Sequence, residues 1–507
     1  MTSTITFLGH FGLDVRLGAA RVVCDPWLSP RGAYLGAWHQ FPANDHLAAT
    51  DLHDAPMLFV SSPRPDHCDL ETLRAFPKTV RVVIPKLASP VLSQRLLALG
   101  FGELRELGDG ETLDLGDGTR LSIVASTTPH LLGATLVLER GGEVIVDQGD
   151  CRLDEAALAR LAALEPAVHL LQFSGDHYLP AILELAPDRA RDEVARARAA
   201  LSDRFFDAAR RVGARHLVPV GGPPAFVDER DFELNFGGGI FYDVDDLALL
   251  AAERAPDLAG RLRPFAPGDV ATRGTDDWRF AARRPYDDKR AYLDAYRRVR
   301  GPLREAQLAE WRAEAAPLDG KELRSYLRDF FQFEDMTAEL GMLVQFSLTD
   351  GPSTWVDFRK KPYRYLAECD EPASFVLTVE SAWVSLVLEG KLTWHDLFMG
   401  RLASIKRDPD RDIPKLMHHF DYRHDEALFN LVRLIDPVLI TLEDEQMEYV
   451  CQRFCPHRGR DLEYATIERG VLTCTAHGWR FDLRRGGRCL WGGETPLLVK
   501  EIRPRKA

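Results

Sequence analysis

Two short segments near the C-terminus carry cysteine and histidine at spacings that suit metal binding. The first is Cys455-Pro456-His457, and after sixteen further residues the second is Cys474-Thr475-Ala476-His477. Two thiolates can hold one iron of a two-iron cluster while two neutral imidazoles hold the other, so each segment supplies one ligand to each iron. The same residue types could instead hold a single zinc ion. Both alternatives assign the ligands to Cys455, His457, Cys474 and His477.

The residues that flank these ligands separate the two alternatives. Pro456-His457-Arg458-Gly459 and residues 477–482 resemble the Rieske domains that feed ring-hydroxylating and related oxygenases. These flanking residues have no role in a zinc site. The resemblance implies a 2Fe-2S cluster with a reduction potential of roughly −150 to +300 mV. Such a cluster stores one electron, so any bond chemistry must take place elsewhere in the chain or on a partner.

Composition and charge exclude several classes of function. The 507 residues include 64 Lys and Arg against 77 Asp and Glu, with a net charge of −13 and no block of basic residues, so we expect no nucleic-acid binding. The N-terminus lacks a basic region followed by an apolar run, and no long stretch is free of charges. We therefore expect a cytoplasmic protein without membrane segments. Eight scattered cysteines do not suit a disulfide scaffold and favour a reducing compartment.

The first 270 residues alternate short apolar runs with glycine, proline and aspartate. A helical period covers residues 189–212 and is closed by Gly213. The mixture predicts sheets that are faced by helices. Strands are expected at residues 5–8, 22–24, 57–60, 80–84, 121–124, 135–138 and 144–146.

A second resemblance covers about half of the chain. Phe7-Leu8-Gly9-His10, Cys24-Asp25-Pro26-Trp27, residues 61–69, Pro129-His130 and Gly149-Asp150 follow the order and approximate spacing of the metallo-β-lactamase superfamily. The resemblance is strongest to the branch with lactonase-like proteins and the CMP-N-acetylneuraminate hydroxylase group. That hydroxylase group also joins a Rieske domain to a domain of this kind. The resemblance implies an N-terminal αββα sandwich.

The metal motif of this superfamily, H-x-H-x-D-H, is altered in this chain. The matching stretch is Ser62-Pro63-Arg64-Pro65-Asp66-His67, in which serine and arginine replace two histidines. The change removes two nitrogen ligands, and Arg64 adds a permanent positive charge where the first metal would bind. A dinuclear zinc hydrolase is therefore difficult to build from these residues.

Part of the superfamily's metal-binding set remains, as Asp66, His67, His130 and Asp150. Two imidazoles with one or two carboxylates suit a mononuclear non-haem iron. We expect His67, His130 and Asp150 to hold one iron, with Asp66 as a further ligand or as a partner of a ligand.

Three other polar residues match the neighbourhood of such a site. Asp176 or His177, in a polar loop after an apolar strand, could complete the metal set. His10 is expected to order the loop beneath the site. One alternative is that these residues are remnants, in a domain that serves as a scaffold or a binding module. Another is an atypical two-metal site.

The chain is expected to be an α/β and β multidomain protein. A metallo-β-lactamase-like domain is assigned to residues 1–270, a linker with an α+β domain to 271–435, and a small Rieske β domain to 436–507. Residues 263–287 are rich in proline, glycine and charge, which predicts a linker. A helix is expected at 289–315 and strands at 345–348, 354–358 and 374–379. The middle part weakly resembles sterol-carrier-like domains.

These features together favour an oxygenase. The cluster would pass electrons to a non-haem iron in the N-terminal domain, which would activate dioxygen and oxidise a small polar metabolite. An external reductase, directly or through a ferredoxin, is expected because no convincing flavin or nicotinamide fingerprint occurs. A homo-oligomer is also expected, since a neighbouring subunit could bring the two centres close together. Two alternatives stay open: a metal-dependent hydrolase with a regulatory cluster, and a non-catalytic electron-transfer or binding protein with a degenerate metal site.

Overall fold

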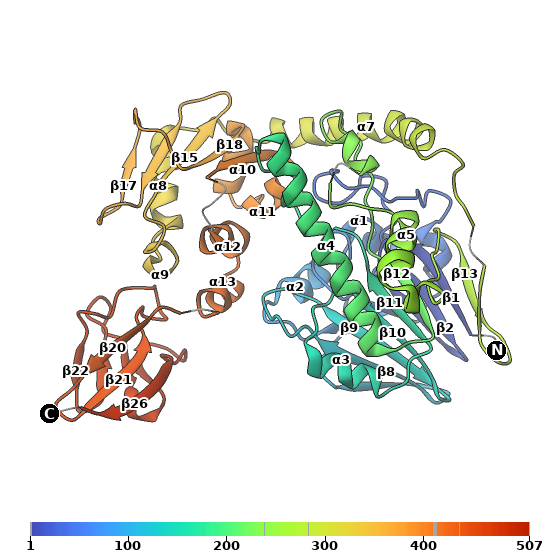
Figure 1. Ribbon diagram of the computed structural model, residues 1–507, viewed down its shortest axis with the longest axis horizontal. Helices are drawn as coiled ribbons and strands as arrows, with labels where there is room; N and C mark the ends of the chain where they lie inside the picture. Colours follow the sequence, from blue (N-terminus) through green and yellow to red (C-terminus); the bar gives the residue numbers. More distant parts are fainter. Residues whose placement is uncertain are drawn as a thin grey trace. The chain divides into compact units, whose positions relative to one another are not determined.

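The chain forms two units, each with its own β-sheets (Figure 1). One unit comprises Met1–Ala313 with Met399–Arg401, and the other comprises Glu314–Phe398 with Leu402–Ala507. The computed structural model describes residues 3–175, 177–237, 239–281, 283–408, 413–435 and 437–505.

The first unit contains an eight-stranded and a six-stranded sheet. In the first sheet β1 to β3 are antiparallel and β3 to β6 are parallel. In the second sheet β10, β11 and β12 are parallel. The first sheet has the order β14 (Trp278–Ala281), β13 (Val270–Arg273), β1 (Thr4–Gly9), β2 (Gly12–Leu17), β3 (Ala20–Cys24), β4 (Met57–Phe59), β5 (Arg81–Pro85), β6 (Leu104–Leu107). The second has the order β12 (His216–Val220), β11 (Val168–Gln172), β10 (Glu143–Gly149), β9 (Ala134–Arg140), β8 (Thr119–Ala125), β7 (Thr112–Gly116).

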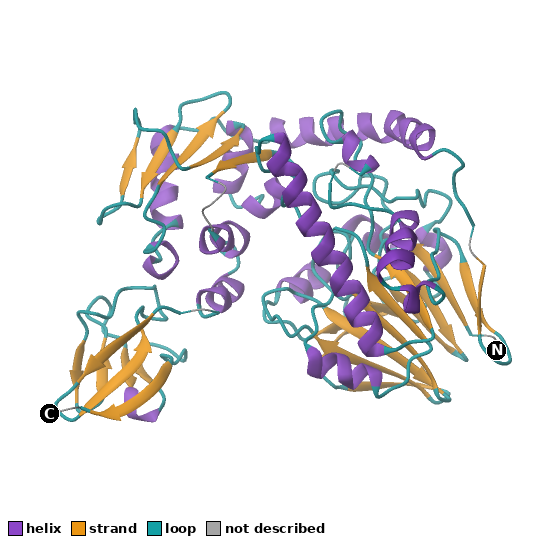
Figure 2. Cartoon of the chain, viewed as in Figure 1, coloured by secondary structure: helices purple, strands orange, loops and turns teal. Residues whose placement is uncertain are grey.

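The two sheets share an apolar core because successive side chains of a strand point to opposite faces. One buried cluster joins Ile5 and Val22 of the first sheet to Ile123 and Leu136 of the second. Another covers the opposite face of the first sheet and includes residues of α1 (Leu70–Ala75) and α2 (Val91–Ala98). On the second sheet, α4 (Pro187–Val212) packs against β11 and α3 (Glu155–Ala162), as Figure 2 shows. The predicted αββα sandwich is confirmed.

Local sequence signals explain where these helices begin and end. The Asp69 and Asp154 carboxylates accept hydrogen bonds from the first turns of α1 and α3. α4 ends at Gly213, whose φ of 74° suits a residue without a side chain, so the predicted helix and its closure are confirmed. The other helices of this unit are η1 (Ala49–Leu52), η2 (Phe232–Phe236), α5 (Val244–Arg254), α6 (Pro256–Ala259) and α7 (Lys289–Ala313).

The linker prediction for residues 263–287 is wrong in its central part. β13 pairs antiparallel with β1, and β14 pairs with β13, at one edge of the eight-stranded sheet. Trp278 is buried there, and its indole N–H donates a hydrogen bond to Glu143 Oε2 at 3.1 Å. The prolines and glycines that suggested a linker lie outside two short strands, and two of the charges, Arg273 and Arg279, lie within them.

The second unit begins with a five-stranded mixed sheet and helices. Its core is aromatic: Phe420 of α12 contacts Phe330, Phe346 and Trp394. The predicted strands at 345–348, 354–358 and 374–379 are confirmed as β15, β16 and β18. The sheet order is β17 (Arg364–Leu366), β16 (Thr354–Asp357), β15 (Leu343–Leu348), β18 (Phe375–Val379), β19 (Ala403–Arg407). The helices are α8 (Gly320–Phe330), α9 (Glu334–Thr337), α10 (Ser381–Leu388), α11 (Trp394–Met399), α12 (Pro414–Tyr422) and α13 (Glu426–Arg433).

The C-terminal part is built from two small antiparallel sheets, as the sequence predicts. Tyr449, Leu472 and Phe481 belong to the apolar cluster that joins them. The three-stranded sheet contains β20 (Leu439–Glu443), β21 (Met447–Gln452) and β26 (Val499–Pro504). The four-stranded sheet contains β22 (Thr466–Glu468), β23 (Val471–Thr473), β24 (Arg480–Asp482) and β25 (Arg488–Trp491).

Among the described residues, no helix is long and apolar enough to cross a membrane.

Candidate metal centre and a buried charge cluster

Two loops with the same backbone pattern carry the C-terminal cysteines. One follows β21 and the other connects β23 to β24. The Gly459 N–H donates to the Cys455 carbonyl at 2.8 Å, and the Gly478 N–H donates to the Cys474 carbonyl at 2.9 Å. Each glycine has a positive φ, +60° and +71°, which glycine adopts without a steric cost. The repeated turn explains why glycine follows each ligand pair in the sequence.

The two loops bring their cysteine thiols together. Cys455 and Cys474 are buried and hydrogen-bonded to each other. The hydrogen bond from Cys455 outweighs burial and, with backbone N–H groups of the second loop, lowers the pKa of Cys474. The same thiol pair, together with burial, raises the pKa of Cys455. One of the two sulfurs is therefore readily available as a thiolate, which is the form that binds metal.

The two histidines of the loops also lie side by side. The ring centroids of His457 and His477 are 4.9 Å apart, and His457 stacks on Trp479 at 4.5 Å. Burial, and then the charges of His477 and two arginines, lower the pKa of His457, which keeps its imidazole neutral. Its Nδ1 is buried without a hydrogen-bond partner. An unsatisfied buried nitrogen in the same loop as a buried thiol suits a metal-binding position.

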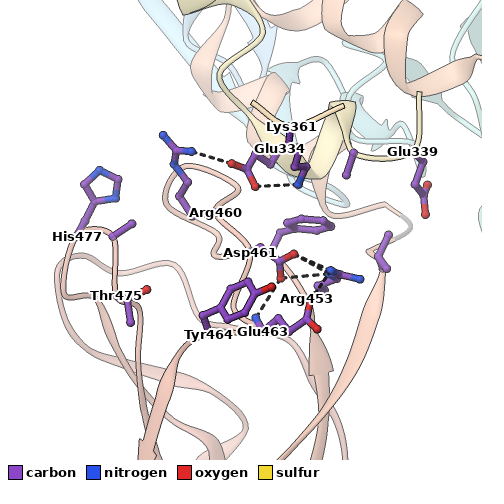
Figure 3. A pocket seen from close by; sticks show the side chains of 14 residues that line it. Glu334, Glu339, Lys361, Arg453, Arg460, Asp461, Glu463, Tyr464, Thr475 and His477 are labelled. Carbon is purple, nitrogen blue, oxygen red and sulfur yellow. Dashed lines mark hydrogen bonds and ion pairs between the residues drawn. The ribbon is translucent and has the colours of Figure 1, made fainter. Parts of the chain in front are cut away.

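The exposed His477 borders a groove of about 770 Å³. Figure 3 shows its ring at one side of the groove, whose other lining residues include Glu334, Lys361 and Arg460. Glu334 accepts from Arg460 at 2.7 Å and from Lys361 at 3.2 Å. The second loop is thus open to solvent at His477, whereas more residues of the first loop are buried.

Residues 415–499 match the Rieske 2Fe-2S domain family. The chain ends in a Rieske domain. Similarity to curated relatives extends over 96% of this chain and 97% of each relative. One of them, from Mycolicibacterium smegmatis, is 28% identical, and one from Mycobacterium tuberculosis is 29% identical. Both are described provisionally as Rieske 2Fe-2S iron-sulfur proteins.

Solved structures are similar to the first part of the chain. Igni18, a metallo hydrolase from Ignicoccus hospitalis, has 16% identity and a TM-score of 0.37, over 54% of this chain and 98% of its own. CmlA, a diiron β-hydroxylase from Streptomyces venezuelae, has 17% identity and a TM-score of 0.37, over 53% of each chain.

In the αββα sandwich, a second group of polar residues lies where several strands end. His10 and Asp25 follow β1 and β3, residues 61–69 follow β4, and Asp150 follows β10. His10 and Asp25 have positive φ values of 50° and 39°. Such values are costly for residues other than glycine, and they often occur at functional positions.

Side chains in this charge cluster, defined by His10, Asp25, Arg64, Asp66, His67 and Asp150, bind one another. The Tyr34 hydroxyl donates to Asp66 Oδ1 at 2.7 Å, and His10 Nε2 lies 3.2 Å from Asp66 Oδ2. His67 Nδ1 lies 2.7 Å from Asp25 Oδ2. His10, which is predicted to order the loop beneath the site, thus contacts a predicted metal ligand, Asp66.

Arg64 lies against two of the residues that were expected to bind metal. Its Nη2 donates to Asp150 Oδ2 and lies 2.9 Å from His67 Nε2. Ser62, at the other altered position of the motif, is fully buried and donates to the Leu132 carbonyl at 2.8 Å. Both substitutions therefore replace possible metal contacts by hydrogen bonds within the protein.

The electrostatics of the charge cluster follow from its burial. Burial opposes a charge on His67, but the Asp150, Asp66 and Asp25 carboxylates outweigh it and raise the pKa of His67 to about 10. Burial also opposes ionisation of Asp150, yet Arg64 and His67 hold its pKa well below the usual range. The short contact between Arg64 and His67 Nε2 suits a neutral imidazole instead. We assign the raised pKa because three carboxylates face the ring.

The remaining predicted ligands lie in loops of the same unit. His130 is half-buried in the loop after β8, and His177 is half-buried after β11. His177 Nδ1 accepts the Leu179 N–H at 3.2 Å. Asp176 lies outside the described residues. Within the described ranges, no group of three or more His, Cys, Asp and Glu side chains is placed to hold a metal ion, so the iron site stays a prediction.

A cluster at the C-terminal loops needs no such group of three, because a Rieske cluster takes only two protein ligands per iron. Sequence reasoning did not identify Asp25 as a member of the charge cluster, or Tyr34 as the donor to Asp66. Asp25 belongs to the Cys24-Asp25-Pro26-Trp27 segment that carried the superfamily resemblance, and this was the available signal.

Proposed function

We propose that this chain is an oxidoreductase that carries single electrons on a 2Fe-2S cluster. In this proposal Cys455 and Cys474 bind one iron, and His457 and His477 bind the other. The observation that carries it is the convergence of the two loops, with two hydrogen-bonded thiols and an unsatisfied buried Nδ1 on His457. The Rieske family match supports the assignment.

The chain's own residues have separable tasks in this function. When bound, the cluster would accept and release one electron at a potential of roughly −150 to +300 mV. Backbone N–H groups of both loops donate to the cysteine sulfurs and favour the thiolate form. The exposed His477 gives a solvent-facing edge at which an external reductase or ferredoxin could approach.

Anaerobic purification followed by iron analysis and EPR tests this proposal. We expect about two irons per chain from the cluster alone and the EPR signal of a reduced Rieske centre. Zinc bound at the four ligands in place of iron, with no EPR signal after anaerobic reconstitution with iron and sulfide, would contradict it.

A more specific candidate is an oxygenase that oxidises a small polar metabolite with dioxygen. It would use a non-haem iron at His67, His130 and Asp150, with Asp66 and His177 as further ligands. The observation that favours it is the gathering of buried Asp66 and His67 with Asp150 at one end of the sandwich strands. Two imidazoles and carboxylates are suitable donors for such an iron.

The charge cluster as described does not fit an iron ion, because Arg64 contacts the donor atoms of His67 and Asp150. An oxygenase centre at this position therefore requires Arg64 to leave the cluster. Arg64 has an exposed side-chain fraction of 29%, against 1% for His67, so it reaches the cluster from its solvent side.

Metal content and product formation together distinguish the candidates. About three irons per chain, reduced to about two by His67→Gln, would support the oxygenase, as would product that needs both reductant and dioxygen. About two irons in both proteins and no such product would leave electron transfer as the function. Zinc-supported turnover without reductant would instead indicate the hydrolase with a regulatory cluster.

A further inference from the structure

An arginine from outside the two loops reaches the backbone of the first loop. Arg433, the last residue of α13, has a side chain that is only 2% exposed. Its Nη2 donates to the Cys455 carbonyl at 3.3 Å, and its Nη1 donates to the Pro456 carbonyl at 3.2 Å. Two adjacent carbonyls of the ligand loop are therefore fixed by one guanidinium.

The other side of this guanidinium is paired with a carboxylate. Arg433 Nε donates to Asp335 Oδ2 at 2.7 Å, and Nη1 donates to Asn430 Oδ1 at 2.9 Å. Asp335 belongs to α9, and its side chain is 11% exposed. The pair thus joins α9 and α13 to the loop that carries Cys455 and His457.

Aromatic rings surround the pair and keep water away. The guanidinium carbon of Arg433 lies 4.6 Å from the centre of the Phe333 ring and 6.0 Å from that of Phe429. Phe333, Phe429, Met336 and Val432 form one apolar cluster. A charge in such surroundings is screened much less than a charge at the surface, so it acts more strongly on nearby groups.

The fit between the pair and the loop depends on Gly459. A Cβ at this position would overlap the Asp335 carboxylate and lie 3.3 Å from Arg433 Nη2. At Gly478, the equivalent position of the second loop, a Cβ would meet only Trp491 at 3.5 Å. The close approach of a buried ion pair is therefore a property of the first loop.

We propose that Arg433 and Asp335 position the first ligand loop and set the reduction potential of the cluster. The inference rests on the proposed function, since it requires Cys455 and His457 to be cluster ligands. Reduction adds one electron to the cluster. A nearby positive charge stabilises the reduced form, and a nearby negative charge destabilises it. Arg433 raises the potential, and Asp335 moderates this effect.

α9 and α13 lie before the predicted Rieske boundary at 436, and α13 falls within the matched residues 415–499. α9 and α13 supply the two charges and the apolar cover around them. The first loop lies against a charge pair, while the second loop exposes His477 to solvent. The two ligand loops thus differ in their electrostatic environment.

The test compares reduction potentials in the full chain loaded with its cluster, by redox titration with optical and EPR detection. Arg433→Gln removes the positive charge and is expected to lower the potential. Asp335→Asn removes the negative charge and is expected to raise it. Arg433→Lys keeps the charge but not the fork of donors, so the potential should return toward that of the parent while the cluster is lost at a lower temperature.

Arg460→Gln is the matched control. Arg460 belongs to the same loop, but its side chain is 49% exposed, so removing its charge should shift the potential much less. The inference is overturned if Arg433→Gln and Asp335→Asn shift the potential in the same direction, or no more than the control. If the Arg433→Gln protein does not bind a cluster, the Asp335→Asn protein provides the test alone. The inference is then overturned if the reduction potential of Asp335→Asn is not higher than that of the parent protein. A parent protein without a Rieske signal would instead refute the proposed function.

Discussion

The charge cluster and the two C-terminal loops satisfy their polar groups in different ways. In the charge cluster, Arg64 pairs with Asp150, His67 with Asp25, and His10 with Asp66. In the loops, two thiols bind each other and His457 Nδ1 is left without a partner. One group of potential ligands is satisfied within the protein, whereas the other leaves a buried nitrogen unsatisfied.

The difference shows that the positive charge of a side chain can stabilise a group of potential metal ligands in place of a metal. Three carboxylates in a buried space need positive charge, because uncompensated buried charges are strongly unfavourable. Arg64 supplies that charge permanently, and no metal has to be present for the charge cluster to be stable. Among the described residues of the two C-terminal loops, no side chain takes the place of a metal in this way. Arg433 of α13 contacts the carbonyl oxygens of the first loop and not the proposed ligand atoms.

The largest expected effect follows from replacing a ligand of the loops. Cys455→Ser and Cys474→Ser should each abolish the visible absorption and the EPR signal of the cluster, because an iron loses one of its two protein ligands. Cys489→Ser is the matched control, since this half-buried cysteine of β25 lies outside both loops. Loss of the signal in the control as well would show that the cysteine substitutions act through folding.

Asp150→Asn tests the other side of the comparison. It leaves Arg64 without its partner, so we expect the unfolding transition of the sandwich to lose about 3–5 kcal/mol while the Rieske signal persists. The double substitution Arg64→Met with Asp150→Leu should recover much of this loss, because it removes both charges. Calorimetry of the full chain separates the transitions.

The exposed pair of Arg120 and Glu139 provides the control for charge removal. Their side chains are 58% and 32% exposed, and Arg120→Met should cost no more than about 1 kcal/mol. Loss of the Rieske signal in Asp150→Asn would contradict the distinction between the charge cluster and the C-terminal loops. It would mean that the charge cluster and the iron-sulfur centre do not fold or function independently.

The pH dependence of stability sharpens the assignment of charge at His67. Its pKa is raised in the folded protein to about 10, so its contribution is complete below the unfolded pKa near 6.5 and is lost as the pH rises to about 10. Between about pH 7 and pH 9.5 the sandwich should lose about 3 kcal/mol.

Calorimetry across this range, compared with His67→Gln, isolates the contribution of the histidine from other titrating groups. The variant should show a flatter profile than the parent. If stability falls with pH in parallel in the two proteins, the His67 imidazole is neutral and accepts a hydrogen bond from Arg64, in agreement with the 2.9 Å contact. Asp66 and Asp150 have lowered pKa values, so their contribution is lost only in acid.

The convergence of the two C-terminal loops could be predicted because their cysteine and histidine residues are local in sequence. Cys455 and His457 share one turn, and Cys474 and His477 share another, so spacing alone constrains their geometry. Seven strands of the sandwich were also predicted, since short apolar runs between turn residues determine them locally, but β2, β6, β7 and β12 were not. The two strands within residues 270–281 were missed, because each has only four residues between polar turns.

The charge cluster and the Arg433 pair could not be predicted in the same way. Tyr34 and Asp66 are 32 residues apart, His67 and Asp25 are 42 apart, and Arg433 and Asp335 are 98 apart. Such pairs depend on how strands and helices pack, which periodicity does not specify. Arg64 was recognised as a charge at a metal position, but its contacts with Asp150 and His67 required the structure.

The smallest expected effect compares the two loop glycines. Gly478→Ala should lower the stability of the Rieske domain by about 1 kcal/mol, because alanine is strained at positive φ. Gly459→Ala carries the same strain and also displaces the Asp335 carboxylate, so about 2–3 kcal/mol is expected. The temperature at which the cluster absorption is lost measures both effects, and only Gly459→Ala should also shift the reduction potential. Equal losses with unchanged potentials would mean that Asp335 and Arg433 move aside at no cost, and the asymmetry between the two loops would then have no electrostatic consequence.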